Sequence, residues 1–184
     1  VEDGTAFAKS EARGHMRTVD PDLSATFYEL VRDRLIGAGF DHYEVSNFAK
    51  SGHRSQHNLA YWQGQDYVGV GPGAHGRITT SKGKLATIAH LRPGAYTTAV
   101  NDDGHGIETT EVLSAEDQAA EYVMMGLRIN DGVSMSHYRA LTGEDLDVAD
   151  LVADGLLIQT GERVAATPSG RFVLNAITAQ LLAG

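Results

Sequence analysis

A helical signal followed directly by a strand signal, early in the chain, is the feature that most constrains its fold. The helix begins at Asp20-Pro21, because an Asp side chain caps the free N–H groups of a first turn and Pro fits at the first helical position. It ends near Gly37 and Gly39, and Phe40–Val45 then has the composition of a short strand. A helix followed by a strand is one step of an α/β fold. The apolar positions that recur at helical spacing are Leu23, Phe27, Leu30, Val31 and Leu35.

The following residues, up to position 110, predict small β elements joined by turns, and we assign residues 1–110 to one unit. Glycine and polar residues punctuate this stretch, which favours loops and hairpins over long helices. The expected elements are a long loop with one helical turn at 46–65, a strand at Tyr67–Val70, a hairpin at Arg77–Ile88 turning at Lys82-Gly83, a short helix at Ala95–Val100 and an exposed turn at Asn101–Gly104.

Residues 111–184 have a different pattern, in which short helices surround one hairpin. Ser114 opens the first helix, with Asp117 three residues later as a weak capping box. The order helix, helix, helix, hairpin, helix is typical of a winged-helix-like module. The later elements are helices at Ser134–Leu141 and Asp145–Ala153, a hairpin from Leu156–Ile158 and Arg163–Ala165, and a last helix after Thr167-Pro168 that carries Phe172, Val173, Ala176, Ile177 and Leu181.

Composition excludes several functional classes. The chain has no cysteine, which excludes disulfides, thiolate metal sites and cysteine-held iron–sulfur clusters within it. No apolar run approaches the roughly 20 residues of a membrane span, so we expect no membrane insertion. Formal net charge is −9, and nucleic-acid binding requires clustered Lys and Arg instead.

A winged helix invites a DNA-binding interpretation, but its charges oppose one. The helix that would enter the groove, Asp145–Asp154, carries four acidic residues and no basic one. Its carboxylates would meet phosphate repulsion where binding needs counterion release. We therefore expect no nucleic-acid partner, and we interpret residues 131–184 as a docking or lid module.

Three motifs in the middle of the chain carry a family resemblance. They are Tyr43–Ala49 (Tyr-Glu-Val-Ser-Asn-Phe-Ala), His57–Trp62 (His-Asn-Leu-Ala-Tyr-Trp) and Asp66–Gly76 (Asp-Tyr-Val-Gly-Val-Gly-Pro-Gly-Ala-His-Gly). Together they resemble the second half of the oxygen-independent coproporphyrinogen III oxidase family. The pattern His-Asn-x-x-Tyr-Trp resembles the haem-chaperone (HemW-type) branch of that family. The opening Val1–Thr5 resembles the loop after a late barrel strand, and the winged-helix-like tail is similar to the family's last module.

The resemblance implies a fold and cofactors for a longer parent protein. The fold is α/β, α+β overall: the C-terminal part of a partial (β/α) barrel with an extra hairpin in residues 1–110, then a winged-helix-like module in 111–184. The parent would hold a 4Fe–4S cluster and S-adenosyl-L-methionine, as radical SAM proteins of porphyrin biosynthesis do. The family's cluster cysteines lie in its other half. Because this chain has no cysteine and does not begin with Met, we expect a fragment or processed product of a cytoplasmic protein, without radical activity by itself.

The motif at 57–62 supplies the main candidates for contact with haem, which the resemblance implies as the ligand. A neutral imidazole is a good axial ligand of haem iron, so His57 is the first candidate. If the segment is helical, His57 and Tyr61 share one face, and the rings of Tyr61 and Trp62 can pack on a porphyrin. The alternative interpretation is structural, with His57 and Asn58 closing a loop and Trp62 in the core.

Further candidates lie on both sides of that motif. Gly71-x-Gly73-x-x-Gly76 matches a dinucleotide fingerprint in its letters only, because a hairpin and not a helix is expected after it. We interpret the run as a bent strand that another backbone or a flat ligand approaches closely. His75 is a secondary iron ligand or a core histidine, and Arg77 is a candidate for haem propionates. Tyr43 and Glu44 either face the barrel mouth or belong to a structural hydrogen-bond network.

Two main hypotheses about function follow. The first is a haem chaperone that binds haem or another tetrapyrrole and transfers it to a haem-accepting protein. The alternative is an oxygen-independent coproporphyrinogen III oxidase, which decarboxylates its substrate oxidatively. The His-Asn-x-x-Tyr-Trp pattern favours the first hypothesis.

Overall fold

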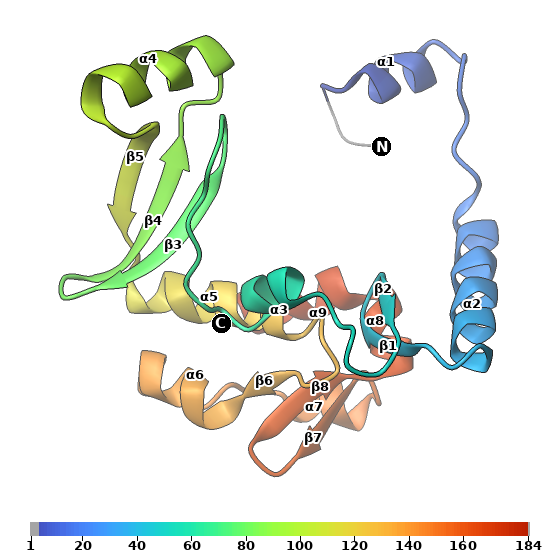
Figure 1. Ribbon diagram of the computed structural model, residues 1–184. Helices are drawn as coiled ribbons and strands as arrows, with labels where there is room; N and C mark the ends of the chain where they lie inside the picture. Colours follow the sequence, from blue (N-terminus) through green and yellow to red (C-terminus); the bar gives the residue numbers. More distant parts are fainter. Residues whose placement is uncertain (1–3, 184) are drawn as a thin grey trace.

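The computed structural model describes residues 4–183 and confirms a mixed α/β fold (Figure 1). Within those residues the strands form three small antiparallel sheets, ordered β1-β2, β3-β4-β5 and β6-β8-β7, and they close no barrel. The helices are α1 (Ala6–Ala12), α2 (Pro21–Gly37), α3 (Gln56–Trp62), α4 (Pro93–Asp103), α5 (Ala115–Gly126), α6 (Met135–Thr142), α7 (Ala149–Ala153), α8 (Pro168–Phe172) and α9 (Leu174–Leu181). The strands are β1 (Asp41–Glu44), β2 (Asn47–Ala49), β3 (His75–Thr80), β4 (Gly83–Ala89), β5 (Ile107–Val112), β6 (Val133–Ser134), β7 (Leu157–Thr160) and β8 (Arg163–Ala166).

The main hydrophobic core lies in the C-terminal part of the chain. Val123 on α5 and Leu127 at its C-terminal cap face this core, together with Leu157 of β7, Val164 of β8 and Ile177 of α9. The helix α5 begins at Ser114, whose Oγ accepts a hydrogen bond from the Asp117 amide at 3.0 Å. The order α5, α6, α7, β7–β8 hairpin, α8–α9 is the predicted one, and β6 adds a third strand beside β8.

An arm made of α1 and α2 stands apart from this core at one edge of the molecule (Figure 1). The helix α2 begins where predicted, since the Asp20 carboxylate accepts a hydrogen bond from the Leu23 amide at 3.0 Å. Its side chains are mostly exposed, and none of its residues is buried. One tie to the rest of the chain is the Tyr28 hydroxyl, which donates to the Val45 carbonyl at 3.1 Å.

On the opposite side, the sheet β3-β4-β5 projects away from the core with α4 at its far end (Figure 1). The β3–β4 hairpin confirms the predicted one, with Thr80 and Gly83 paired at its turn. The strand β5 was not predicted, and it pairs along β4 from Val112 to Ile107. The proposed division after residue 110 therefore lies near the end of β5.

Other predictions from the sequence are wrong in detail. At Tyr67–Val70 there is one bridge, between Tyr67 and Arg77, because the valines that follow point to solvent. The expected turn at 101–104 is the end of α4, which stops at Gly104 in a left-handed conformation (φ 77°). The loop at 46–65 contains β2 and all of α3, and the helix expected from 145 begins at Ala149.

The last predicted helix is in fact two helices. It breaks at Val173, whose backbone leaves the helical region, so α8 ends at Phe172 and α9 begins at Leu174. The break turns Leu174 and Ile177 into the core and leaves Phe172 and Val173 exposed. In residues 4–183 no helix is long and apolar enough to cross a membrane. Residues 1–3, part of the opening segment compared with a barrel loop, lie outside the described residues.

Candidate functional site

Three aromatic rings on and beside α3 form an edge-to-face series, which we call the aromatic ladder: His57, Tyr61 and Tyr67. The exposed His57 ring meets the Tyr61 ring with centroids 4.7 Å apart and planes at 90°. Tyr61 then meets Tyr67 at 4.3 Å and 69°. The four-residue spacing on α3 places His57 and Tyr61 on one helix face, as the sequence predicted. The ladder therefore presents an accessible imidazole at one end and two phenol rings behind it.

The start of α3 is fixed from inside the fold by Tyr43. Ser55 is the N-cap, and its Oγ accepts a hydrogen bond from the Asn58 amide at 3.3 Å. The Ser55 amide in turn donates to the Tyr43 hydroxyl at 3.3 Å. The Tyr43 side chain is buried, whereas Asn58 is half-buried in the first turn of α3. Tyr43 thus positions the helix that carries His57 and does not reach an open surface.

The end of α3 is fixed by a buried carboxylate. Glu44 is 0% exposed, and its Oε1 accepts hydrogen bonds from Arg128 Nε at 3.1 Å and Nη2 at 2.9 Å. Its Oε2 accepts from the Ser46 amide at 2.9 Å and from Asn47 Nδ2 at 2.5 Å. The Arg128 guanidinium lies over the Trp62 ring, 4.7 Å from its centroid. The chain of contacts from Glu44 through Arg128 to Trp62 holds the last turn of α3 in place.

Trp62 itself carries an unusual polar group. Its indole Nε1 is buried and has no hydrogen-bond acceptor among residues 4–183. Leaving a buried N–H without an acceptor costs about 1–3 kcal/mol in proteins. In native proteins a buried polar group of this kind marks strain, function or a bound water or ion. The rest of the Trp62 side chain is half-buried.

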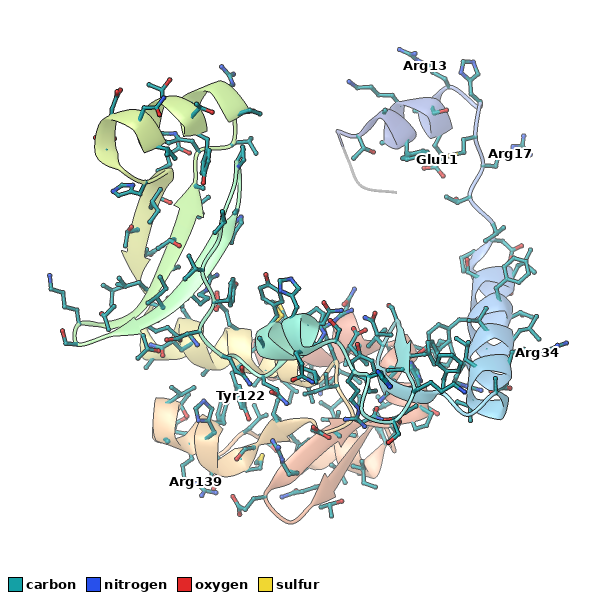
Figure 2. The ribbon with its side chains drawn as sticks, in the orientation of Figure 1. Glu11, Arg13, Arg17, Arg34, Tyr122 and Arg139 are labelled. Carbon is teal, nitrogen blue, oxygen red and sulfur yellow. The ribbon has the colours of Figure 1, made fainter. Side chains whose placement is uncertain are left out.

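A cavity of about 330 Å³ opens behind the aromatic ladder, between α3, the β3–β4 hairpin, α5 and α6. Tyr61 and Tyr67 form one wall, and Tyr122 and His137 form another, with ring centroids 4.5 Å apart. Figure 2 shows Tyr122 between α5 and α6, and its hydroxyl accepts a hydrogen bond from the Ser134 amide at 2.7 Å. Burial raises the pKa of Tyr67, so this phenol is neutral at physiological pH. The cavity walls therefore combine aromatic rings with the charged groups of Asp66, Arg77, Lys84 and Glu121.

The two secondary candidates lie two positions apart on β3 and line one cavity together. His75 is exposed at the start of the strand, on the wall of this cavity, which α5 faces. Arg77 is half-buried and forms a two-pronged ion pair with Glu121, with Nε to Oε2 at 2.9 Å and Nη2 to Oε1 at 2.6 Å. Hydrogen bonding to Glu121 raises the pKa of Arg77. Its charge already has a carboxylate partner.

The glycine run allows close packing of backbone, as interpreted from the sequence. A Cβ on Gly69 would lie 2.3 Å from the His75 carbonyl oxygen, and one on Gly76 would lie 2.5 Å from Thr87 Oγ1. Neither position has room for a larger residue. The strand β3, and not a helix, follows the run.

The structure brings His57, Tyr61 and Trp62 together on α3, and it places Tyr43 and Glu44 beneath that helix. Sequence reasoning missed Tyr67 and Arg128. Tyr67 stands in the motif at 66–76, but its side chain was assigned to a strand. Arg128 is 84 residues from Glu44 in sequence, and no local pattern signals such a pair.

The available ligands favour a flat cofactor with its own metal over a bare ion. Among residues 4–183, no group of three or more His, Asp or Glu side chains could hold a metal ion. Haem iron is held by its porphyrin and needs only one or two axial ligands from the protein. One accessible imidazole beside aromatic rings meets that requirement.

The sequence of this chain is similar to proteins of one known family. Residues 113–173 match the model of the HemN C-terminal domain. The chain is 36% identical over 182 residues to the heme chaperone HemW of Mycobacterium tuberculosis, an alignment that covers 99% of this chain and 45% of that protein. It is 31% identical over 184 residues to HemW of Bacillus subtilis, covering 96% and 47%. The chain thus spans less than half the length of these relatives.

Two further similarities agree with the first. The mitochondrial radical S-adenosyl methionine domain-containing protein 1 of Mus musculus is 35% identical over 195 residues, which covers 99% of this chain and 44% of that protein. Among solved structures, the coproporphyrinogen III oxidase HemN of Escherichia coli, a radical SAM enzyme, superposes with a TM-score of 0.65. At 16% identity, over 89% of this chain and 42% of that one, this match establishes the fold.

Proposed function

We propose that this chain, which belongs to the haem-chaperone (HemW) branch of the HemN-like radical SAM family and corresponds to its C-terminal half, supplies a haem-binding surface to a haem chaperone. Relatives at 30–36% identity bear the name heme chaperone HemW. The matching solved structure is an oxidase, but its 16% identity supports the fold alone. The oxidase alternative is therefore not favoured.

The observation that carries the proposal is the aromatic ladder. His57 is exposed on α3, and its ring stands perpendicular to that of Tyr61, so the imidazole is accessible to a ligand. Haem brought to this face would take His57 as axial ligand, with Tyr61 and the half-buried Trp62 beside the macrocycle.

The radical chemistry of the family would reside elsewhere in the parent protein. A 4Fe–4S cluster needs cysteine thiolates, and this chain has none, so its residues do not fit that cofactor. We assign the binding of S-adenosyl-L-methionine to that other part of the parent protein as well. The role of residues 4–183 in this proposal is to bind haem, orient it and release it to an acceptor protein.

Residues 131–184, within the winged-helix-like module 111–184, are the proposed docking module for that acceptor, and 1–110 the proposed barrel part. Their separation is supported by the position of the main core, whose fully buried members lie on α5 and later elements. We propose a cytoplasmic location for the whole protein.

An optical titration tests the proposal. Haem is added to the full-length protein and the Soret band is followed, for the native sequence and for His57→Ala. We expect His57→Ala to shift the band and to weaken binding by about tenfold or more, which corresponds to about 1.4 kcal/mol. The matched control is His53→Ala, an exposed histidine in the loop before α3 that has no ring contact among the described residues.

A second variant separates the ligand from its surroundings. Tyr61→Leu keeps the imidazole but removes the ring beside it, so we expect a nearly unchanged Soret position and an affinity lowered about threefold. If His57→Ala leaves both spectrum and affinity as they were, His57 is not the iron ligand and the proposal for this site fails.

A further inference from the structure

A second cavity, of about 690 Å³, lies between α2 and the β7–β8 hairpin, and we call it the arginine pocket. It shares no lining residue with the cavity behind the aromatic ladder. Ile36 and Phe40 line it from the α2 side, and Ile158 lines it from β7. Arg32 and Arg171 add two guanidinium groups to this mainly apolar surface.

The guanidinium of Arg171 is held by neutral groups. Its Nη1 lies 3.1 Å from His42 Nδ1, and its Nη2 donates to Asn130 Oδ1. The other ring nitrogen, His42 Nε2, lies 3.0 Å from the Val45 carbonyl oxygen. A carbonyl only accepts and a guanidinium only donates, so His42 carries its proton on Nε2 and is uncharged. The contacts orient the Arg171 side chain without neutralising its charge.

No carboxylate compensates Arg171 directly. In the part of the chain that the structure describes, Arg171 forms no ion pair. Glu44 favours the charge of Arg171 from a distance, but its carboxylate is bound to Arg128. Burial lowers the pKa of Arg171, which reflects the cost of a cation in partly apolar surroundings. An anion entering the pocket would remove that cost.

The remaining charges leave the pocket positive. Asp41 lines it, but the Asp41 carboxylate accepts hydrogen bonds from Arg54 Nε at 3.1 Å and from Arg54 Nη2. Arg32 is paired at 2.9 Å with Asp33, its neighbour on α2, which is mostly exposed to solvent. The result is a cationic pocket in a chain whose net charge is −9.

We propose that the arginine pocket binds a small organic carboxylate with an apolar body, independently of haem binding at the aromatic ladder. The planar fork of Arg171 matches the two oxygens of a carboxylate, and Arg32 stands on the same pocket wall as Tyr28 and Ile36 of α2. Ile158, which pairs with Ala165 across the hairpin, offers an apolar surface to the rest of the ligand.

Size and charge select this ligand class. Cavities of roughly 300–1,000 Å³ with apolar walls and a few polar groups are typical sites for small molecules. A phosphate would bring up to two negative charges into mainly apolar surroundings, at a greater desolvation cost than one carboxylate. A single carboxylate on a hydrocarbon frame matches both parts of the lining.

The test uses octanoate as the probe, with octanamide as its uncharged analogue, titrated into the full-length protein by calorimetry. We expect native protein to bind octanoate saturably and octanamide about tenfold or more weakly. Arg171→Gln should lower the octanoate affinity about tenfold or more, and Arg32→Gln about threefold. The matched control is Arg34→Gln, on α2 like Arg32. The Arg34 side chain points away from the molecule (Figure 2) and does not line the pocket.

Three results would overturn the proposal: no saturable octanoate binding, equal binding of octanoate and octanamide, or an equal loss in Arg34→Gln and Arg171→Gln. If Arg171→Gln does not fold, as circular dichroism would show, Arg32→Gln still decides the question. Haem affinity is expected to be the same in Arg171→Gln as in the native protein. A parallel loss of haem and octanoate would instead assign the pocket to haem propionates and refute an independent site.

Discussion

The helices α2 and α5 have similar apolar patterns, but the apolar stripe is buried on α5 and exposed on α2. Both begin at a side-chain cap, Asp20 or Ser114, and both repeat apolar residues every three or four positions. On α5 the stripe enters the core, where Leu127 is 0% exposed. On α2 most of the stripe is exposed, and Leu30 is 51% exposed.

The difference shows that periodicity predicts a helix and its apolar face but does not supply the surface that covers the face. The α5 stripe packs against the β7–β8 hairpin and α9, which lie within about 60 residues of it in the sequence. On α2, the contact with the rest of the described chain is made by Tyr28, whose ring packs edge to face on Phe172, and the apolar stripe contributes little to it. The two regions should therefore respond very differently to equivalent substitutions.

The largest expected difference is between Leu127→Ala and Leu30→Ala. Truncating a fully buried leucine removes its transfer free energy and leaves a cavity, so we expect Leu127→Ala to lower the unfolding free energy by about 4 kcal/mol. Leu30→Ala, on an exposed face and with a good helix former, should change it by about 0.5 kcal/mol or less. Urea denaturation followed by far-ultraviolet circular dichroism measures both. Equal losses would mean that α2 is packed in solution and the comparison is wrong.

A smaller difference is expected between two ion pairs. Glu44 is buried and satisfies four donors, two of them from Arg128, so Glu44→Gln should cost about 2–3 kcal/mol and loosen α3. Glu121, paired with Arg77, has a side chain that is 31% exposed, so Glu121→Gln should cost about 1 kcal/mol or less. Thermal denaturation of both variants tests the order. A larger loss for Glu121→Gln would contradict the support role given to Glu44.

The sequence predicted what local chemistry determines. Helix starts at Asp20, Ser114 and Thr167 follow from caps, and both hairpins follow from turn residues between apolar runs. The pairing of His57 with Tyr61 follows from helical spacing. These features depend on residues within a few positions of each other.

The missed features depend on distant partners. The strand β5 is rich in β-branched residues but lacks an alternation of apolar and polar positions, and its pairing along β4 is what defines it. The role of Glu44 depends on Arg128, and the contact of Arg171 with His42 spans 129 positions. No sequence pattern of one chain reports such contacts, so both the support beneath α3 and the arginine pocket became visible only in three dimensions.

Helix caps give a third and smaller contrast between the arm and the core. Ser114→Ala removes the acceptor for the Asp117 amide and should cost about 1 kcal/mol of global stability, since α5 is part of the core. Asp20→Ala removes the equivalent cap of α2, but fraying of an uncovered helix should leave the global unfolding free energy nearly unchanged. Hydrogen exchange of the α2 amides, measured beside urea denaturation, should show faster exchange in Asp20→Ala only. If Asp20→Ala lowered the global unfolding free energy by about 1 kcal/mol as well, α2 would unfold together with the core and the contrast would be wrong.

The smallest expected effect concerns the pH dependence contributed by His42, where β1 meets α8. Burial, and then the charges of Arg171 and Arg32, lower the pKa of His42 below 6.5, although the Val45 carbonyl and Glu44 oppose the shift. The unfolded chain therefore binds more protons than the folded one as the pH falls below about 6.5, and stability decreases there. Above that pH the stabilisation is fully present. In His42→Gln the unfolding free energy should fall less steeply between pH 7 and pH 5 than in the native protein, as followed by urea midpoints. His42→Gln also removes a partner of Arg171, so the test compares the slope of unfolding free energy against pH and not the absolute stability. An unchanged slope would mean that folding does not lower the pKa of His42.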